Sequence, residues 1–160
     1  MMKNYLQILQ DSLVKKLELM TQIEQKSLEQ SNMIKGSDVD LSLIDSNMDE
    51  KAQLIEQILS LDEGFENIYE KIRKELLPNK EQYKNEIVSL QKMIEKVTEK
   101  SASIQAIEAR NKMEMEVIFS KQKKSLQSKR NAMSVAKDYY QNMNKVKHVS
   151  PQFLDQKNKI

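Results

Sequence analysis

Apolar residues recur along most of this chain at intervals of three or four positions, the spacing that places them on one face of an α-helix. The clearest run extends over residues 41–76. Nine of its eleven seam positions are apolar, and Lys51 and Asp62 are the exceptions. Alternating spacings of three and four are typical of coiled-coil seams. The seam consists of Leu41, Ile44, Met48, Lys51, Ile55, Ile58, Asp62, Phe65, Tyr69, Ile72 and Leu76.

Two further helices are predicted on either side of this segment. The first covers residues 3–34, and its apolar face consists of Leu6, Leu9, Leu13, Leu17, Met20, Ile23 and Leu28. The third begins with Asn79 as its N-cap, after Pro78 has ended the second helix. It extends to about residue 144, because no glycine or proline interrupts residues 80–145.

The connections between these helices are predicted to be short. We expect Gly36 to end the first helix with a positive φ, and Ser37 to cap a second helix over residues 38–77. A local break of that helix near residues 45–47 is also possible on the sequence, since Asp-Ser-Asn is a capping sequence. Short connections favour antiparallel neighbours.

The predicted fold is therefore all-α: an antiparallel helical hairpin plus a long third helix, forming an elongated three-helix bundle or coiled coil. Because the third helix is predicted to be longer than the other two, its C-terminal half should protrude without an intramolecular partner. We expect a bundle over residues 1–104, an extended arm over 105–145 and a flexible tail over 146–160.

Composition favours binding over catalysis. The chain has two glycines, two prolines and no cysteine, so disulfides and thiolate metal sites are excluded. Its single histidine, His148, has no second His or Cys as a co-ligand. We therefore expect no enzymatic activity, no cofactor and no small-molecule substrate. With no apolar run suited to a signal peptide or a membrane span, we expect a cytoplasmic protein.

Charge is distributed unevenly. Residues 1–120 carry 16 basic and 22 acidic side chains, whereas residues 121–160 carry 10 and 2. A basic segment after an acidic body favours an interaction arm, although a solvated helix face is equally consistent. Acidic protein surfaces are the favoured partners. A membrane surface and nucleic acid are weaker alternatives, because only one of the eight basic residues over 121–147 is arginine and no base-reading motif is present.

Four segments carry a resemblance to a known family. Residues 48–65 contain a Lys-x-x-Leu-Ile-x-x-Ile sequence followed by Leu-Asp-Glu-Gly, and residues 34–38 precede them as a helix connection. Residues 138–143 contain a Tyr-Tyr pair, and residues 150–155 contain Pro-Gln-Phe. Together these resemble the FlgN-type flagellar export chaperones over most of the chain.

The resemblance implies a chaperone of flagellar assembly that acts in type III protein export. Its partners would be the C-terminal helices of hook-associated (hook–filament junction) proteins, which it would hold back from premature assembly, and the cytoplasmic domain of the export gate. An aromatic residue of the last helix is associated with gate docking in such chaperones, so Tyr139 and Tyr140 are candidates for that role.

We expect the client to bind along the unpaired apolar stripe of the third helix. This stripe consists of Met115, Ile118, Phe119, Leu126, Met133 and Tyr140. Flexible methionine side chains suit a surface that accepts different partner helices. The rival interpretation is a generic coiled-coil scaffold or homodimer, in which the third helix pairs with a second copy.

Overall fold

The computed structural model describes residues 1–36, 38–121 and 138–139 of the chain. Helix α1 extends over Met2–Lys35, α2 over Leu41–Leu76 and α3 over Lys84–Lys121, with a short 3-10 helix, η1, at Leu77–Asn79. No strand occurs in these ranges. The predicted all-α architecture is confirmed, with three helices in one bundle and α1 packed against both of the others.

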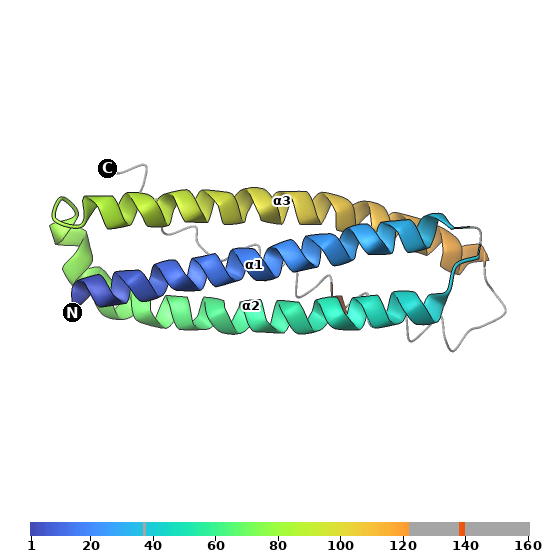
Figure 1. The fold of residues 1–160 in the computed structure, drawn as a ribbon, viewed down its shortest axis with the longest axis horizontal. Helices are drawn as coiled ribbons and strands as arrows, with labels where there is room; N and C mark the ends of the chain where they lie inside the picture. Colours follow the sequence, from blue (N-terminus) through green and yellow to red (C-terminus); the bar gives the residue numbers. More distant parts are fainter. Residues whose placement is uncertain (37, 122–137, 140–160) are drawn as a thin grey trace.

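The three helices lie side by side along their lengths (Figure 1). Helix α1 lies between the other two in that view, antiparallel to α2 and parallel to α3. They contain 34, 36 and 38 residues, so each is about 51–57 Å long. Because their lengths match, the described part of α3 has α1 beside it from end to end.

Alternating steps of four and three residues set most of the inner face of each helix. The predicted α2 seam is confirmed at every position except Leu41, and both polar exceptions are buried. In α1 the inner face differs from the expected one, because Leu28 is exposed and Lys16, Ser27 and Gln30 are buried instead. This spacing is that of a left-handed coiled coil.

The helix ends differ from the sequence prediction in detail. Gly36 has φ −68° and ψ 157°, an extended conformation, so the expected left-handed cap is wrong. Asp40 caps α2, and its carboxylate accepts the backbone N–H groups of Ser42 at 2.9 Å and Leu43 at 3.4 Å. Because Asp40 caps α2, the chain leaves α1 without a positive φ. Helix α2 then continues unbroken through residues 45–47.

The turn after α2 is longer than predicted. Pro78 lies in η1, and α3 begins at Lys84 instead of directly after Asn79. The Asn79 side chain does not cap α3, since its Nδ2 donates to the carbonyl of Glu75 at 2.7 Å. This turn returns the chain to the level of the N-terminus of α1, where α3 starts (Figure 1).

The core divides into two apolar clusters. The first apolar cluster runs from Met2, Leu76 and Tyr83 at one end of the bundle to Ile23 and Ile104 further along it. The second apolar cluster lies toward the other end, and its buried members are Ile34, Ile44, Met48, Met115 and Phe119. Polar side chains occupy the interior between the two clusters.

Candidate functional site

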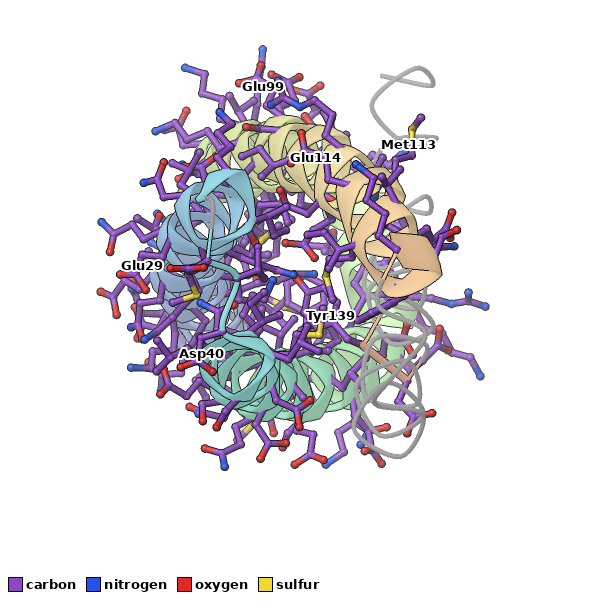
Figure 2. All side chains as sticks on the ribbon, turned by 90° about the vertical axis from the view of Figure 1, so that its right-hand side faces the viewer. Glu29, Asp40, Glu99, Met113, Glu114 and Tyr139 are labelled. Carbon is purple, nitrogen blue, oxygen red and sulfur yellow. The ribbon has the colours of Figure 1, made fainter. Side chains whose placement is uncertain are left out.

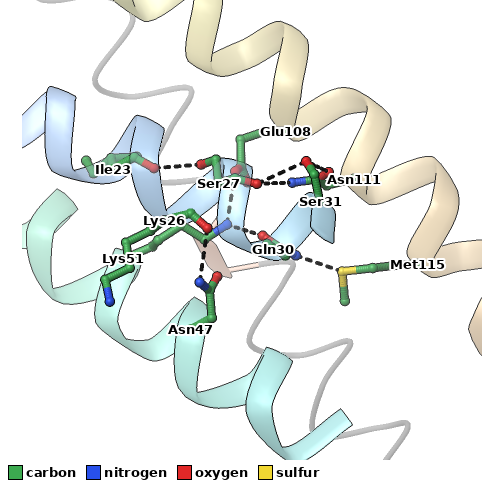
Figure 3. A network of polar contacts seen from close by, with 10 residues as sticks. All are labelled: Ile23, Lys26, Ser27, Gln30, Ser31, Asn47, Lys51, Glu108, Asn111 and Met115. Atoms are coloured by element: carbon green, nitrogen blue, oxygen red, sulfur yellow. Dashed lines mark hydrogen bonds and ion pairs between the residues drawn. The ribbon is translucent and has the colours of Figure 1, made fainter. Parts of the chain in front are cut away.

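The polar side chains between the apolar clusters form a connected layer centred on Lys51. The Lys51 ammonium on α2 lies 2.9 Å from Oε1 of Glu108 on α3, and it also donates to Oε1 of Gln30 on α1. Lys51 is 0% exposed and Glu108 is 2% exposed. One lysine therefore links all three helices inside the bundle (Figure 3).

Asn111 of α3 extends this layer toward α1. Its Nδ2 donates to the backbone carbonyl of Ser27 at 2.9 Å, and its Oδ1 accepts from the Ser31 hydroxyl at 2.7 Å. Ser27 donates in turn to the carbonyl of Ile23 at 2.8 Å. We call Ser27, Gln30, Lys51, Glu108 and Asn111 the Lys51 layer; all five are buried.

Burial sets the electrostatics of this layer. It lowers the pKa of Lys51, while the charge and the hydrogen bond of Glu108 oppose that change. A charge removed from water is tolerated only where a partner and hydrogen bonds compensate the lost hydration. The Gln30 oxygen and the Glu108 carboxylate supply that compensation and fix the direction of the lysine side chain.

The Lys51 layer lies where the three-helix packing is incomplete. Helix α1 packs against both α2 and α3, but no pair of α2 and α3 residues has Cα atoms within 8 Å in the described ranges. The Lys51–Glu108 ion pair therefore reaches across a wide separation of backbones. We call this flank of the bundle the α2–α3 side.

Tyr139 lies on the α2–α3 side, although it follows the described end of α3 by 18 positions. Figure 2 shows it between α2 and α3, facing the interior of the bundle. Its ring is 0% exposed, and its centroid lies 4.6 Å from Nζ of Lys51. A cation over an aromatic face is attracted to the ring quadrupole. An aromatic side chain from outside the three helices therefore contacts the buried lysine.

The structure describes three of the six residues in the predicted client stripe. Met115 and Phe119 are buried in the second apolar cluster, with Ile118 packed against it half-buried, so these residues are not an uncovered surface. Leu126, Met133 and Tyr140 lie outside the described residues. The expectation that the chain from residue 105 onward lacks an intramolecular partner is wrong for residues 105–121.

Sequence reasoning missed the Lys51 layer because it read polar residues as gaps in the seam. Glu108 and Asn111 are buried on α3, in the region that the sequence predicts to lack an intramolecular partner. The available signal was Lys51 itself, a lysine in the middle of the best apolar seam. A buried lysine requires an acidic or amide partner at the matching level of another helix.

A second buried ion pair crosses the first apolar cluster. Nζ of Lys16 on α1 lies 2.9 Å from Oδ1 of Asp62 on α2. Burial raises the pKa of Asp62 to about 6, although Lys16 lowers it, and burial lowers the pKa of Lys16. The two polar exceptions in the α2 seam, Lys51 and Asp62, thus each form a buried ion pair with another helix.

Other kinds of site find little support in the described ranges. Within residues 1–36, 38–121 and 138–139, His, Cys, Asp and Glu side chains form no group of three or more that could hold a metal ion. None of the helices in these ranges is long and apolar enough to cross a membrane. His148 lies outside them.

Comparison of the chain with protein family models, with curated proteins and with solved structures finds no match.

Proposed function

We propose that this protein is a cytoplasmic, non-enzymatic chaperone that binds an amphipathic helix of its client on the α2–α3 side. The observation that carries the proposal is the incomplete packing of the described helices there: α1 packs against both other helices, but α2 and α3 have no pair of Cα atoms within 8 Å. Helical bundles are commonly completed by a fourth helix, and an amphipathic helix laid against two others is a common mode of recognition.

The sequence resemblance suggests who the client is. The segments that resemble FlgN-type chaperones favour the C-terminal helices of hook–filament junction proteins as the bound helices, and the flagellar export gate as the later partner. Docking to the gate through Tyr139 would require its ring to leave the interior, because it is fully buried.

Leu59 offers a direct test of the location. Asn47 faces α1, since its Nδ2 donates to the carbonyl of Lys26 at 3.0 Å. Leu59 lies 12 positions later, which is about 120° further around α2 and on the flank turned away from α1. It is half-buried against the first apolar cluster. A charge at this position should obstruct a helix seated on the α2–α3 side.

The experiment is titration calorimetry of the full chain with C-terminal peptides of the junction proteins encoded in the same genome. We expect Leu59→Asp to weaken binding at least tenfold, about 1.4 kcal/mol. Ile8→Asp is the matched control, because Ile8 is an exposed apolar residue of α1. Equal affinities for wild type and both variants would place the client elsewhere.

Light scattering on the same samples addresses the rival interpretation. A chaperone should form a complex with the peptide at the stoichiometry found by calorimetry. A stable dimer that binds no peptide would replace this proposal with a coiled-coil scaffold.

A further inference from the structure

Tyr139 occupies a defined place in the bundle without belonging to any of its three helices. Its ring joins the first apolar cluster, together with α2 residues such as Ile55 and Ile58. Beneath the ring lies the Lys51 ammonium, 4.6 Å from the centroid. The Tyr139 ring is therefore surrounded by apolar side chains and has a cation against one face, an environment that suits a flat aromatic ring.

The Lys51 ammonium has other contacts besides the Tyr139 ring. Nζ of Lys51 lies 2.9 Å from Glu108 and also donates to Gln30, so two polar contacts besides the ring hold its ammonium. A fixed cation with its charge already balanced favours an uncharged aromatic side chain over a carboxylate. The Lys51 ammonium therefore favours an aromatic ring, but that ring need not be the one of Tyr139.

We propose that Tyr139 occupies the position that an aromatic anchor of the client takes when the client binds. A client helix bearing Phe, Tyr or Trp then displaces Tyr139 from the face of Lys51. This inference rests on the proposed function and adds the partner's chemistry and a competition within the chain. Aromatic anchors that fill pockets carry much of the energy of helix recognition. While Tyr139 occupies this position, the client's ring cannot. The apparent affinity for the client is therefore reduced in proportion to the fraction of molecules in which Tyr139 has left the position.

The opposite interpretation is that Tyr139 is a permanent part of the core. It predicts that removing the ring weakens the bundle and leaves client affinity unchanged or lower. Competition predicts that removing the ring raises affinity. The two interpretations therefore differ in the sign of one measurable quantity.

The first measurement is the Kd of the full chain for the junction-protein C-terminal peptides, by titration calorimetry. We expect Tyr139→Ala to bind about fivefold more tightly than wild type, or better. Tyr83→Ala is the matched control, because Tyr83 is another buried tyrosine of the first apolar cluster, and it should leave the Kd unchanged. Peptides with their aromatic residues changed to alanine should lose the advantage of Tyr139→Ala.

The second measurement does not require Tyr139→Ala to fold. The chain has no tryptophan, so Tyr139→Trp supplies a single fluorophore in the same place. We expect its emission to be blue-shifted and protected from iodide in the free protein. Saturating peptide should shift it to the red and make it quenchable.

Binding by wild type with an unchanged or weaker Kd in Tyr139→Ala, or a fluorophore that stays protected at saturation, would overturn the competition while leaving the proposed function in place. Absence of binding by wild type, Tyr139→Ala and Tyr139→Trp alike would overturn both. Binding that appears only in Tyr139→Ala would support both.

Discussion

The Lys51 ammonium on α2 lies 2.9 Å from a Glu108 carboxylate oxygen on α3, and this ion pair joins two helices whose backbones do not otherwise approach. A buried pair of this kind adds little net stability compared with well-packed apolar residues, but losing one partner is costly. Its value is in specificity, because Glu108 can meet Lys51 in only one register of α3. The polar layer thus selects one arrangement among the many that a repetitive seam allows.

The first prediction concerns this pair. Lys51→Met should lower the free energy of unfolding by about 3–5 kcal/mol, because Glu108 stays buried after losing its cation. Lys51→Met combined with Glu108→Leu should recover most of that loss, since an apolar pair needs no compensation. Urea unfolding followed by circular dichroism measures wild type, Lys51→Met, Glu108→Leu and the double variant.

Lys15→Met is the control for removing a lysine. Lys15 lies 3.7 Å from Glu18 on the surface, where both side chains are more than half exposed. Its loss should change stability by less than about 1 kcal/mol. If the double variant loses the sum of its two single effects, Lys51 and Glu108 are not coupled and the register argument fails.

The second prediction is a pH dependence that originates at Asp62. Burial raises the pKa of Asp62 from 3.8 to about 6, with a further contribution from the charge of Glu66, while Lys16 opposes the increase. The folded protein therefore binds this proton more tightly than the unfolded chain. The resulting stabilisation is complete below about pH 3.8 and is lost as the pH rises through about 6.

Asp62→Asn removes this titration while keeping the shape of the side chain. The stability of wild type relative to Asp62→Asn should fall by up to about 3 kcal/mol between about pH 4 and pH 6.5. Lys16, whose pKa is lowered by burial, acts in the opposite sense at higher pH. Glu63→Gln, at an exposed neighbour on α2, is the control. A constant difference across that range would show that Asp62 titrates alike in both states.

Much of this fold follows from the sequence because its apolar period is regular. The α2 seam, with Lys51 and Asp62 as its exceptions, coincides with the buried face at ten of eleven positions. The apolar period did not show which residues pair with Lys51 and Asp62. A period places a residue on a helix face, but Lys16 and Glu108 become partners only through the relative axial positions of the helices.

The left-handed cap expected at Gly36 and the uncovered face expected for residues 105–121 were wrong for related reasons. Local sequence at Gly36 fits a left-handed cap, but Asp40 provides another N-cap for α2 a few residues later. On α3, Glu108 and Asn111 look like solvent-facing residues until their partners Lys51 and Ser27 are known. Burial of Tyr139 could not be predicted from a period at all, because its contact is with a residue 88 positions earlier.

The third prediction concerns Gly64, in the interior of α2. A Cβ built at this position meets no atom within 4 Å, so the close helix approach that could account for a glycine is absent among the described residues. Gly64→Ala should stabilise the protein by about 0.5–1 kcal/mol, because alanine loses less backbone entropy in a helix. Thermal unfolding measures the gain. A loss of stability would indicate that another group packs against the bare backbone.

The fourth prediction concerns the end of the bundle that contains Phe119. Among the described residues, five buried apolar side chains make up the second apolar cluster, against twenty in the first, and the Lys51 layer separates the two. A small cluster behind a polar layer can open without disrupting the larger one. Amide hydrogens near Phe119 should therefore exchange faster than those near Leu90, which lies in the middle of the first cluster.

Two alanine variants show whether that opening is local. Ile58→Ala removes a fully buried side chain from the first apolar cluster and should cost about 2–5 kcal/mol, speeding exchange throughout the bundle. Phe119→Ala should speed exchange near residue 119 and leave the amides near Leu90 almost unchanged. Leu28→Ala, at an exposed position of α1, is the control and should alter neither region. If Phe119→Ala speeds exchange near Leu90 as much as near residue 119, the two clusters unfold together and the Lys51 layer does not divide the bundle.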